Sequence, residues 1–254
     1  MAEPCQLVAL HGFAGSGADF DPLRGEGIDL AWHTPDLPGH GTNLPADPDA
    51  YRIPDIARVV GGLLGSVPRP RILLGYSMGG RIALRAALDR PDLLDALVLV
   101  GASPGLADEP DRRARIAQDD ALAAHVESVG VQAFAAEWAR VPLIATQRRI
   151  AEPWRSAMTA RRARNDCAGL ARSLRLTGTG RMEPLHHRLA ALTCPTLLVV
   201  GEQDPKFRSI AQAMRLPQSQ LCVLPGAGHA AHLERPAAFL AALRGWCADV
   251  LGMC

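Results

Sequence analysis

The sequence has almost no lysine and no excess of charge of either sign. Its 27 basic residues are balanced by 26 acidic ones, and every basic residue except Lys206 is an arginine. Proteins that bind nucleic-acid phosphates or anionic membranes normally carry a surplus of positive charge. We therefore expect neither nucleic acid nor a membrane as a partner. An arginine-rich genome is the simplest cause of the arginine bias, but it does not say where the arginines lie.

Long apolar runs and regularly spaced cysteines are also missing. No run approaches the roughly 20 apolar residues that span a bilayer, and residues 1–10 lack the positive region of a secretory signal. The six cysteines form neither a C-x-x-C pair nor a Cys/His metal spacing. Several of them lie in apolar runs, which suits buried free thiols in a reducing compartment. We expect a cytoplasmic protein, monomeric or a small homo-oligomer, with no metal and no organic cofactor.

Short apolar runs alternate with longer amphipathic segments along most of the chain. This alternation predicts an α/β fold in which a mostly parallel sheet is flanked by helices, and the 48% apolar content is enough to fill its core. The six expected strands are residues 6–10, 30–34, 71–75, 96–100, 196–200 and 220–224. Residues 106–185 contain no convincing strand and many residues at helical spacing, so we expect a helical insertion there. Functional groups of such sheets lie just beyond the carboxyl ends of the strands, where an insertion would cover them.

A G-x-S-x-G pattern follows the third expected strand. It reads Gly75-Tyr76-Ser77-Met78-Gly79, with an apolar run before it and a helical segment after it. This is the strand, tight turn and helix context of a nucleophile elbow, in which the glycines allow a strained serine with close neighbours. We therefore expect Ser77 to be a nucleophile.

A serine hydroxyl needs a base to take its proton and a third group to orient that base. In a fold of this kind the chain order is serine, then an acid, then histidine. Asp204 follows the fifth expected strand and His229 follows the sixth, so both lie in the required order. Glu202 is an alternative to Asp204, and His232 is an alternative to His229.

An oxyanion hole would use the backbone amide of Met78 and one from the turn after the first expected strand. That turn, residues 11–17, is rich in glycine, and we expect the amide of Phe13 to face the ligand. A phosphate-binding loop is the competing interpretation, but the sequence has neither the G-K-[ST] ending nor G-x-G-x-x-G. We expect His11 and His40 to stabilise turns.

Together these segments resemble the α/β-hydrolase superfamily and, within it, the 2-succinyl-6-hydroxy-2,4-cyclohexadiene-1-carboxylate synthases of menaquinone biosynthesis. The resemblance covers nearly the whole chain. Its most distinctive segments read LHGF at 10–13, DLPGHG at 36–41, GYSMGGR at 75–81, SPGL at 103–106, GEQDPKF at 201–207 and GHAAH at 228–232. It implies an α/β-hydrolase core at 1–104 and 186–254 with a helical cap at 105–185.

The resemblance also implies an elimination rather than a hydrolysis. In that family, a carbon–oxygen lyase removes a proton α to the succinyl carbonyl and pyruvate leaves the ring, while negative charge develops in the oxyanion hole. Ser77, Asp204 and His229 would be its catalytic triad. The substrate is small and carries several carboxylates, and arginine binds such groups through bidentate, permanently charged hydrogen bonds.

The residues implied to bind this anionic substrate come from the elbow, the cap and the segment after Asp204. They are Tyr76, Arg81, Arg115, Trp138, Arg162, Lys206 and Phe207. In the cap, Arg112 competes with Arg115, and Arg161 competes with Arg162. Interleaved acidic residues in the cap make a solvated helix face the plain alternative for its arginines.

Two other functions stay open at this point. A serine carboxylesterase or C–C bond hydrolase acting on a small anionic substrate would need the triad but no arginine cluster. A ligand-binding receptor on the same fold would need neither lyase nor hydrolase activity. The intact triad argues against a receptor.

Overall fold

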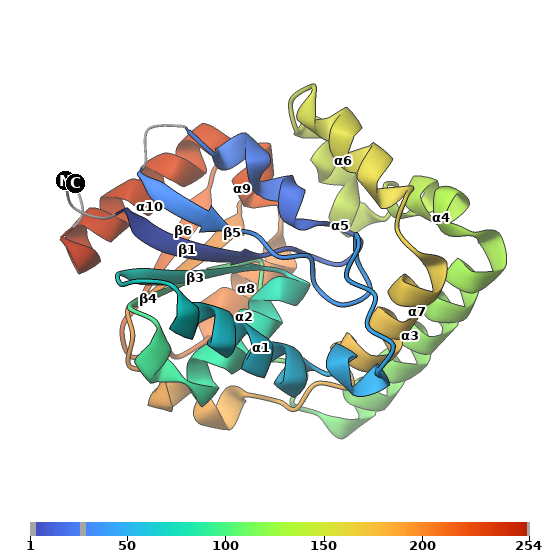
Figure 1. The fold of residues 1–254 in the computed structure, drawn as a ribbon, viewed down its shortest axis with the longest axis horizontal. Coiled ribbons are helices and arrows are strands. Elements are labelled where there is room, and N and C mark those ends of the chain that lie inside the picture. Colours follow the sequence, from blue (N-terminus) through green and yellow to red (C-terminus); the bar gives the residue numbers. More distant parts are fainter. Residues whose placement is uncertain (1–3, 26–28, 253–254) are drawn as a thin grey trace.

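A six-stranded parallel sheet runs through the computed structural model, which describes residues 4–25 and 29–252 (Figure 1). The strands are β1 (Cys5–Leu10), β2 (Leu30–His33), β3 (Arg71–Tyr76), β4 (Ala96–Val100), β5 (Thr196–Gly201) and β6 (Ser219–Leu224). Their spatial order is β2-β1-β3-β4-β5-β6, and every pair is parallel. The α/β fold with six strands is therefore confirmed, and each expected strand end lies within one residue of the observed one.

The central strands are apolar along their whole length because both of their faces are covered. In β4, Leu97, Val98 and Leu99 are all buried, and Val98 lies opposite Leu74 of β3. The chain moves from β1 to β2 on one side and then to β3 on the other. This reversal between β1 and β3 creates the crevice in which open α/β sheets bind their ligands.

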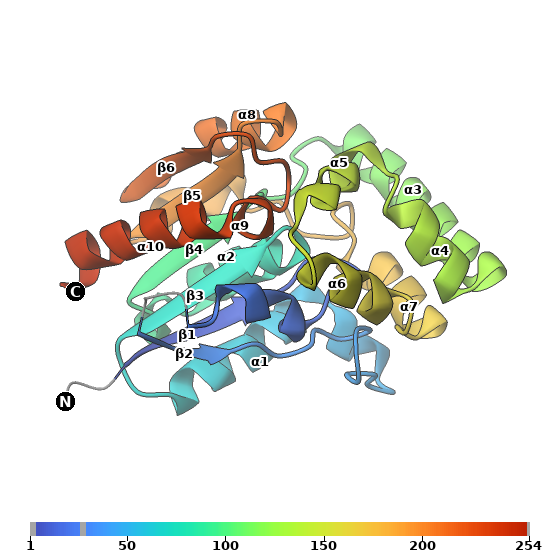
Figure 2. The same ribbon diagram turned by 90° about the horizontal axis from the view of Figure 1, so that it is seen from above.

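Two layers of helices cover the sheet (Figures 1 and 2). On one face are α1 (Ile53–Ser66), α2 (Met78–Asp89) and α8 (Pro205–Ala213), whose apolar residues join one core cluster. On the other face are η1 (Gly17–Leu23), α9 (Ala231–Glu234) and α10 (Pro236–Leu251), which join a second cluster. The short 3₁₀ helices η2 (Pro48–Tyr51), η3 (Pro91–Leu93) and η5 (His186–Ala191) lie in the connections. In the described part of the chain, no helix has the length and apolarity needed to cross a membrane.

The segment between β4 and β5 is helical. It contains α3 (Glu109–Val129), α4 (Val131–Trp138), α5 (Pro142–Ala145), η4 (Thr146–Arg149), α6 (Trp154–Arg162) and α7 (Cys167–Thr177). Ala123 of α3 and Leu170 of α7 belong to a third apolar cluster, which Ala14 joins from the sheet side and against which Phe13 packs. Figure 2 shows these helices beside the carboxyl end of the sheet. The segment is closed at its base, where the Leu185 N–H donates a hydrogen bond of 2.8 Å to the Pro104 carbonyl oxygen.

Replacement of Leu99 by Ala tests the packing of the central strand. Leu99 is 1% exposed, so we expect the free energy of unfolding to fall by about 2–5 kcal/mol, because buried methyl groups are lost and a cavity remains. Urea denaturation followed by circular dichroism measures this. The control is Val59→Ala. Val59 lies on α1 and is 65% exposed, so its replacement should change the free energy of unfolding by less than about 0.5 kcal/mol. Equal losses in the two variants would contradict the assignment of Leu99 to the core.

Candidate active site

Ser77 lies in the turn between β3 and α2 with φ 52° and ψ −107°. This left-handed conformation is strained for a residue with a side chain, and it is held by a 2.9 Å hydrogen bond from the Ser77 N–H to the Val100 carbonyl oxygen. A Cβ atom on Gly75 would overlap the Gly79 carbonyl oxygen, and one on Gly79 would overlap that of Leu10. Close approach of backbone therefore requires the two glycines of the pattern.

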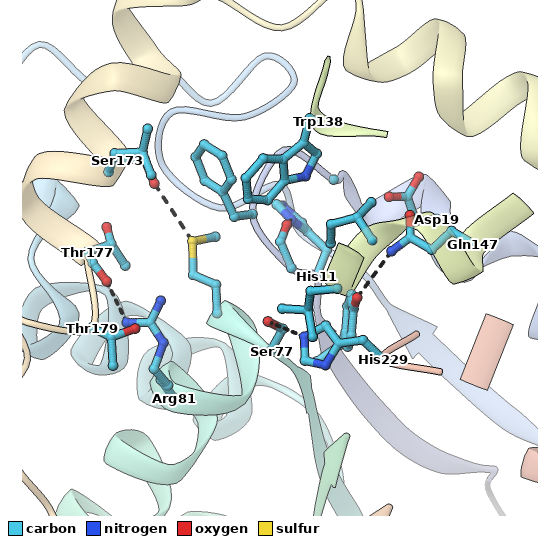
Figure 3. A pocket seen from close by; sticks show the side chains of 18 of the residues that line it. His11, Asp19, Ser77, Arg81, Trp138, Gln147, Ser173, Thr177, Thr179 and His229 are labelled. Carbon is cyan, nitrogen blue, oxygen red and sulfur yellow. Dashed lines mark hydrogen bonds between the residues drawn. The ribbon is translucent and has the colours of Figure 1, made fainter. Parts of the chain in front are cut away.

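Three side chains from three strand ends form a hydrogen-bonded chain at this turn. The Ser77 Oγ lies 3.0 Å from His229 Nε2, and His229 Nδ1 lies 2.7 Å from Asp204 Oδ2 (Figure 3). His229 is 2% exposed and Asp204 is 4% exposed. An ionised carboxylate only accepts hydrogen bonds, so Nδ1 carries the proton and Nε2 is free to accept one from the serine. This arrangement makes Ser77 an activated hydroxyl.

Asp204 is also the N-cap residue of α8. Its Oδ1 accepts the Phe207 N–H at 3.2 Å while Oδ2 accepts from His229. The carboxylate of Glu202 instead accepts the Gly226 N–H at 2.9 Å. The ring of His232 packs 4.7 Å from that of Tyr76, and in the described residues it makes no hydrogen bond to Ser77. The geometry therefore favours Asp204 and His229 over both alternatives.

Two backbone amides are available beside Ser77. The described residues offer no hydrogen-bond acceptor to the N–H groups of Phe13 and Met78, whereas the next amide in α2, that of Gly79, donates to the His11 carbonyl oxygen at 3.1 Å. Both Phe13 and Met78 line the pocket above the serine. Met78 begins α2, so its amide also lies at the positive end of the helix dipole.

The turn that carries Phe13 is held by two buried histidines. His40 Nε2 accepts the Ala14 N–H at 3.0 Å, and His11 Nε2 accepts the Leu37 N–H at 2.9 Å. In each ring, Nδ1 lies within 3.1 Å of a backbone carbonyl oxygen to which it donates. As expected, both histidines stabilise turns.

A pocket that is open to solvent lies above Ser77 and beneath the helical segment (Figure 3). All the residues expected to bind substrate line it, together with Ser77 and His229. They are Phe13, Tyr76, Met78, Arg81, Arg115, Trp138, Arg162, Lys206 and Phe207. Asp204 lies behind His229 and does not line the pocket. The structure thus brings the three residues of the Ser–His–Asp chain and the residues expected to bind substrate to one place.

Arg81 and Arg115 lie in one part of the pocket. Arg81 is buried, and its Nη1 donates to the Thr177 carbonyl oxygen at 2.6 Å. Burial lowers the pKa of Arg81 to about 10, so the side chain is charged at neutral pH. Arg115 Nε pairs with Asp119 Oδ1 at 2.8 Å, whereas Arg112 pairs with an exposed glutamate and does not line the pocket.

Arg162 lies in another part of the pocket, in a chain of polar groups. Its Nη2 donates to Gln147 Oε1 at 2.6 Å, and Gln147 Nε2 lies 3.3 Å from the Tyr76 hydroxyl oxygen. Arg162 Nε is buried and has no partner among the described residues. Burial lowers the pKa of Arg162. Its neighbour Arg161 pairs with Asp19 at 2.7 Å and does not line the pocket.

Three further residues named from the sequence complete the walls. The Trp138 ring packs edge-on against Phe13, with 5.4 Å between centroids, and its Nε1 is buried without a partner among the described residues. The Phe207 ring lies 4.4 Å from that of His229, and Lys206 Nζ lies 5.8 Å from the Phe207 ring centre. This part of the wall therefore combines aromatic rings with the basic side chain of Lys206.

Several polar residues that line the pocket carry no signal in the sequence. These are Asp19, Asp119, Gln147, Ser173, Thr177 and Thr179. None follows a strand or belongs to a recognisable pattern, and only the packing of the helices turns them inward. Within the described residues, no cluster of three or more His, Cys, Asp or Glu side chains could hold a metal ion.

Comparison with known proteins agrees with this geometry. Residues 7–243 match the model of the alpha/beta hydrolase family, and the chain belongs to this family. It is 34% identical over 238 residues to the 2-succinyl-6-hydroxy-2,4-cyclohexadiene-1-carboxylate synthase of Enterobacter sp. (strain 638), with 93% of this chain and 89% of the relative covered. It is 38% identical over 241 residues to a Bacillus subtilis (strain 168) protein provisionally given the same name, with 92% and 86% covered. The structure superposes on that of MenH from S. aureus with a TM-score of 0.93 at 29% identity, covering 99% of this chain and 96% of that one.

The buried histidines around the site predict a loss of stability in acid. Burial lowers the pKa values of His40 and His232 from 6.5 to about 3. Below pH 6.5 the unfolded chain therefore binds protons that the native protein excludes, and unfolding is favoured. We expect each histidine to lower the free energy of unfolding by about 2 kcal/mol between pH 8 and pH 5. Urea titrations at several pH values measure this.

His232→Phe should make that fall smaller because it removes one titrating ring. His187→Asn, on an exposed residue of η5, should leave the fall unchanged. A stability that does not vary between pH 8 and pH 5 would contradict the assignment.

Proposed function

We propose that the protein is a carbon–oxygen lyase that eliminates pyruvate from 2-succinyl-5-enolpyruvyl-6-hydroxy-3-cyclohexene-1-carboxylate. The product is 2-succinyl-6-hydroxy-2,4-cyclohexadiene-1-carboxylate, an intermediate of menaquinone biosynthesis. The observation that carries this proposal is a Ser–His–Asp chain that opens into a pocket lined by three arginines and a lysine. Relatives named for this synthase match over nearly the whole chain, which supports the same assignment.

In the proposed reaction, His229 accepts the hydroxyl proton of Ser77, and the serine oxygen removes the proton α to the succinyl carbonyl. The carbonyl oxygen becomes an enolate oxygen, which the amides of Phe13 and Met78 stabilise by hydrogen bonds. When the carbonyl re-forms, the ring double bond shifts and the C–O bond to the enolpyruvyl group breaks. The departing enolate takes up the proton and becomes pyruvate, so no metal or redox partner is needed.

The cationic groups hold the substrate carboxylates away from the serine. Figure 3 shows Arg81 and Gln147 on opposite sides of Ser77, and Gln147 holds Arg162. Carboxylates bound on the two sides would fix the reacting carbon between them, over the Ser77 hydroxyl. Fixing the reacting groups in this way removes much of the entropic part of the barrier.

We assign residues 1–104 and 186–254 to the α/β-hydrolase core and residues 105–185 to the helical cap. The cap supplies Arg115, Trp138 and Arg162 to the pocket. We also infer a cytoplasmic location and a monomer or small homo-oligomer whose partner is the small anionic substrate. The described cysteines are all free thiols, which supports a reducing compartment.

Ser77→Ala should reduce pyruvate release from the enolpyruvyl substrate by about 10³-fold or more, because no hydroxyl remains to transfer the proton. A lactate dehydrogenase assay measures the pyruvate. Ser66→Ala, at an exposed position in α1, is the matched control and should leave the rate unchanged. Cleavage of aryl esters by the native protein without pyruvate release would instead identify a carboxylesterase, which uses the same Ser–His–Asp chain.

Arg81→Ala should lower kcat/KM for the same substrate by an amount equivalent to about 1.5–3 kcal/mol, the usual range for a hydrogen bond to a charged group. Arg81→Lys should not restore the rate, because an ammonium group does not bind a carboxylate in bidentate fashion. Arg58→Ala, in an exposed ion pair on α1, is the control. An unchanged kcat/KM in Arg81→Ala would remove this residue from the substrate site.

A further inference from the structure

Glu234 is a buried acid directly beneath the turn that carries His229. It belongs to α9 and is 4% exposed. Its Oε2 accepts the Gly228 N–H at 2.8 Å, and its Oε1 accepts the Ala230 N–H at 3.3 Å. The two amides flank His229 in the chain, so one carboxylate holds the backbone on both sides of the base.

The same carboxylate also reaches the helical cap. Its Oε1 accepts the Thr146 hydroxyl at 2.8 Å, and Arg149 Nη1 lies 3.9 Å from Oε2. Both residues belong to η4, which also carries Gln147, the partner of Arg162 and Tyr76 in the pocket. There is no space between the two segments, because a Cβ atom on Gly228 would overlap the Thr146 side chain.

These contacts explain why a carboxylate is tolerated at a buried position. A buried charge is costly unless hydrogen bonds satisfy it, and Glu234 accepts three of them through its two oxygens. The nearest guanidinium is 3.9 Å away and partly exposed, so the backbone amides and the hydroxyl are its principal partners. Hydrogen bonds to an ionised acceptor are stronger than neutral ones.

We propose that Glu234 is a positioning residue for the proposed reaction: it fixes the backbone around His229 and ties that turn to η4 of the cap. The base and the residue that holds Arg162 are thereby placed by one carboxylate. We call these contacts of Glu234 with Gly228, Ala230 and Thr146 the clamp. The proposal rests on the proposed function only because one of its tests measures pyruvate release; the contacts of the clamp themselves do not involve substrate.

Three variants separate the parts of this clamp. Glu234→Ala removes all its hydrogen bonds. Glu234→Gln removes the charge but keeps an oxygen for the Gly228 amide, while its NH₂ group can donate to a reoriented Thr146 hydroxyl. Of the backbone hydrogen bonds it loses only the one from the Ala230 N–H, because an NH₂ group cannot accept it. Thr146→Val removes only the link to the cap.

Two measurements read out these variants. The first is kcat and KM for pyruvate release. The second needs no substrate: it is the downfield proton NMR signal of the His229 Nδ1–H that is hydrogen-bonded to Asp204. We expect Glu234→Ala to lower kcat by about 10- to 100-fold, the scale of a small displacement of a catalytic group, and to lose the signal to exchange with water. Glu234→Gln should keep the signal and stay within about fivefold of the native kcat.

Thr146→Val should keep the signal and raise KM by about three- to tenfold, because η4 is no longer tied to the turn. In the Glu234→Ala background the same substitution should change nothing further, since its partner is already gone. If Thr146→Val raises KM by the same factor in the Glu234→Ala background as in the native protein, the proposed link is overturned.

Glu202→Ala is the matched control. Its carboxylate accepts the N–H of Gly226, in the same turn, but lies on the exposed side. It should leave kcat and the NMR signal unchanged. A folded Glu234→Ala protein that keeps the native NMR signal and has a kcat within twofold of native would overturn the proposal. If Glu234→Ala does not fold, the kcat, KM and NMR signal of Glu234→Gln and Thr146→Val decide, and an unchanged KM in Thr146→Val would overturn the link to the cap. A native protein that releases no pyruvate would refute the proposed function, while the NMR signal would still test the clamp.

Discussion

Asp204 accepts hydrogen bonds through both of its carboxylate oxygens, one from the first turn of α8 and one from the imidazole of His229. The first bond satisfies an amide that a helix start leaves without a partner. It also fixes the plane of the carboxylate, so the second bond can hold the imidazole in one tautomer and one orientation. The site then depends on strand β5, which ends at Gly201 and delivers Asp204 to this position.

The residues that line the pocket come from two parts of the structure, the carboxyl ends of the sheet and the helical segment between β4 and β5. The sheet ends carry the hydrogen-bonded pair Ser77 and His229, together with the amides of Phe13 and Met78, which no acceptor among the described residues occupies. The helical segment supplies two of the four cations that line the pocket, and each of the two is held by a protein partner, in the pairs Arg115–Asp119 and Arg162–Gln147. An arginine that is already oriented loses less conformational entropy when it binds a carboxylate.

The sequence predicts the sheet and the residues at its ends well, for physical reasons. The central strands are apolar runs because both of their faces are buried, and Ser77 and Asp204 are recognisable because each follows such a run. His229 follows β6, an edge strand that is mostly exposed or half-buried, and the glycine-containing turn before it is its signal. The near-zero net charge still argues against nucleic acid, yet it conceals a cationic pocket that only folding assembles. In the cap, helical periodicity cannot separate Arg112 from Arg115, since residues three apart lie on nearly the same face. Gln147 and Glu234 had no local signal at all, because their partners are distant in sequence.

The hydrogen bond between Leu185 and Pro104 closes the base of the helical segment beside adjacent strands β4 and β5. The cap is therefore a loop whose two ends are already joined, and the entropy of closing a loop changes only slowly with its length. Helices in it can be lengthened, shortened or exchanged with little effect on the register of the sheet. Evolution can thus alter which molecules such a scaffold accepts while the proton-transfer groups at the strand ends stay in place.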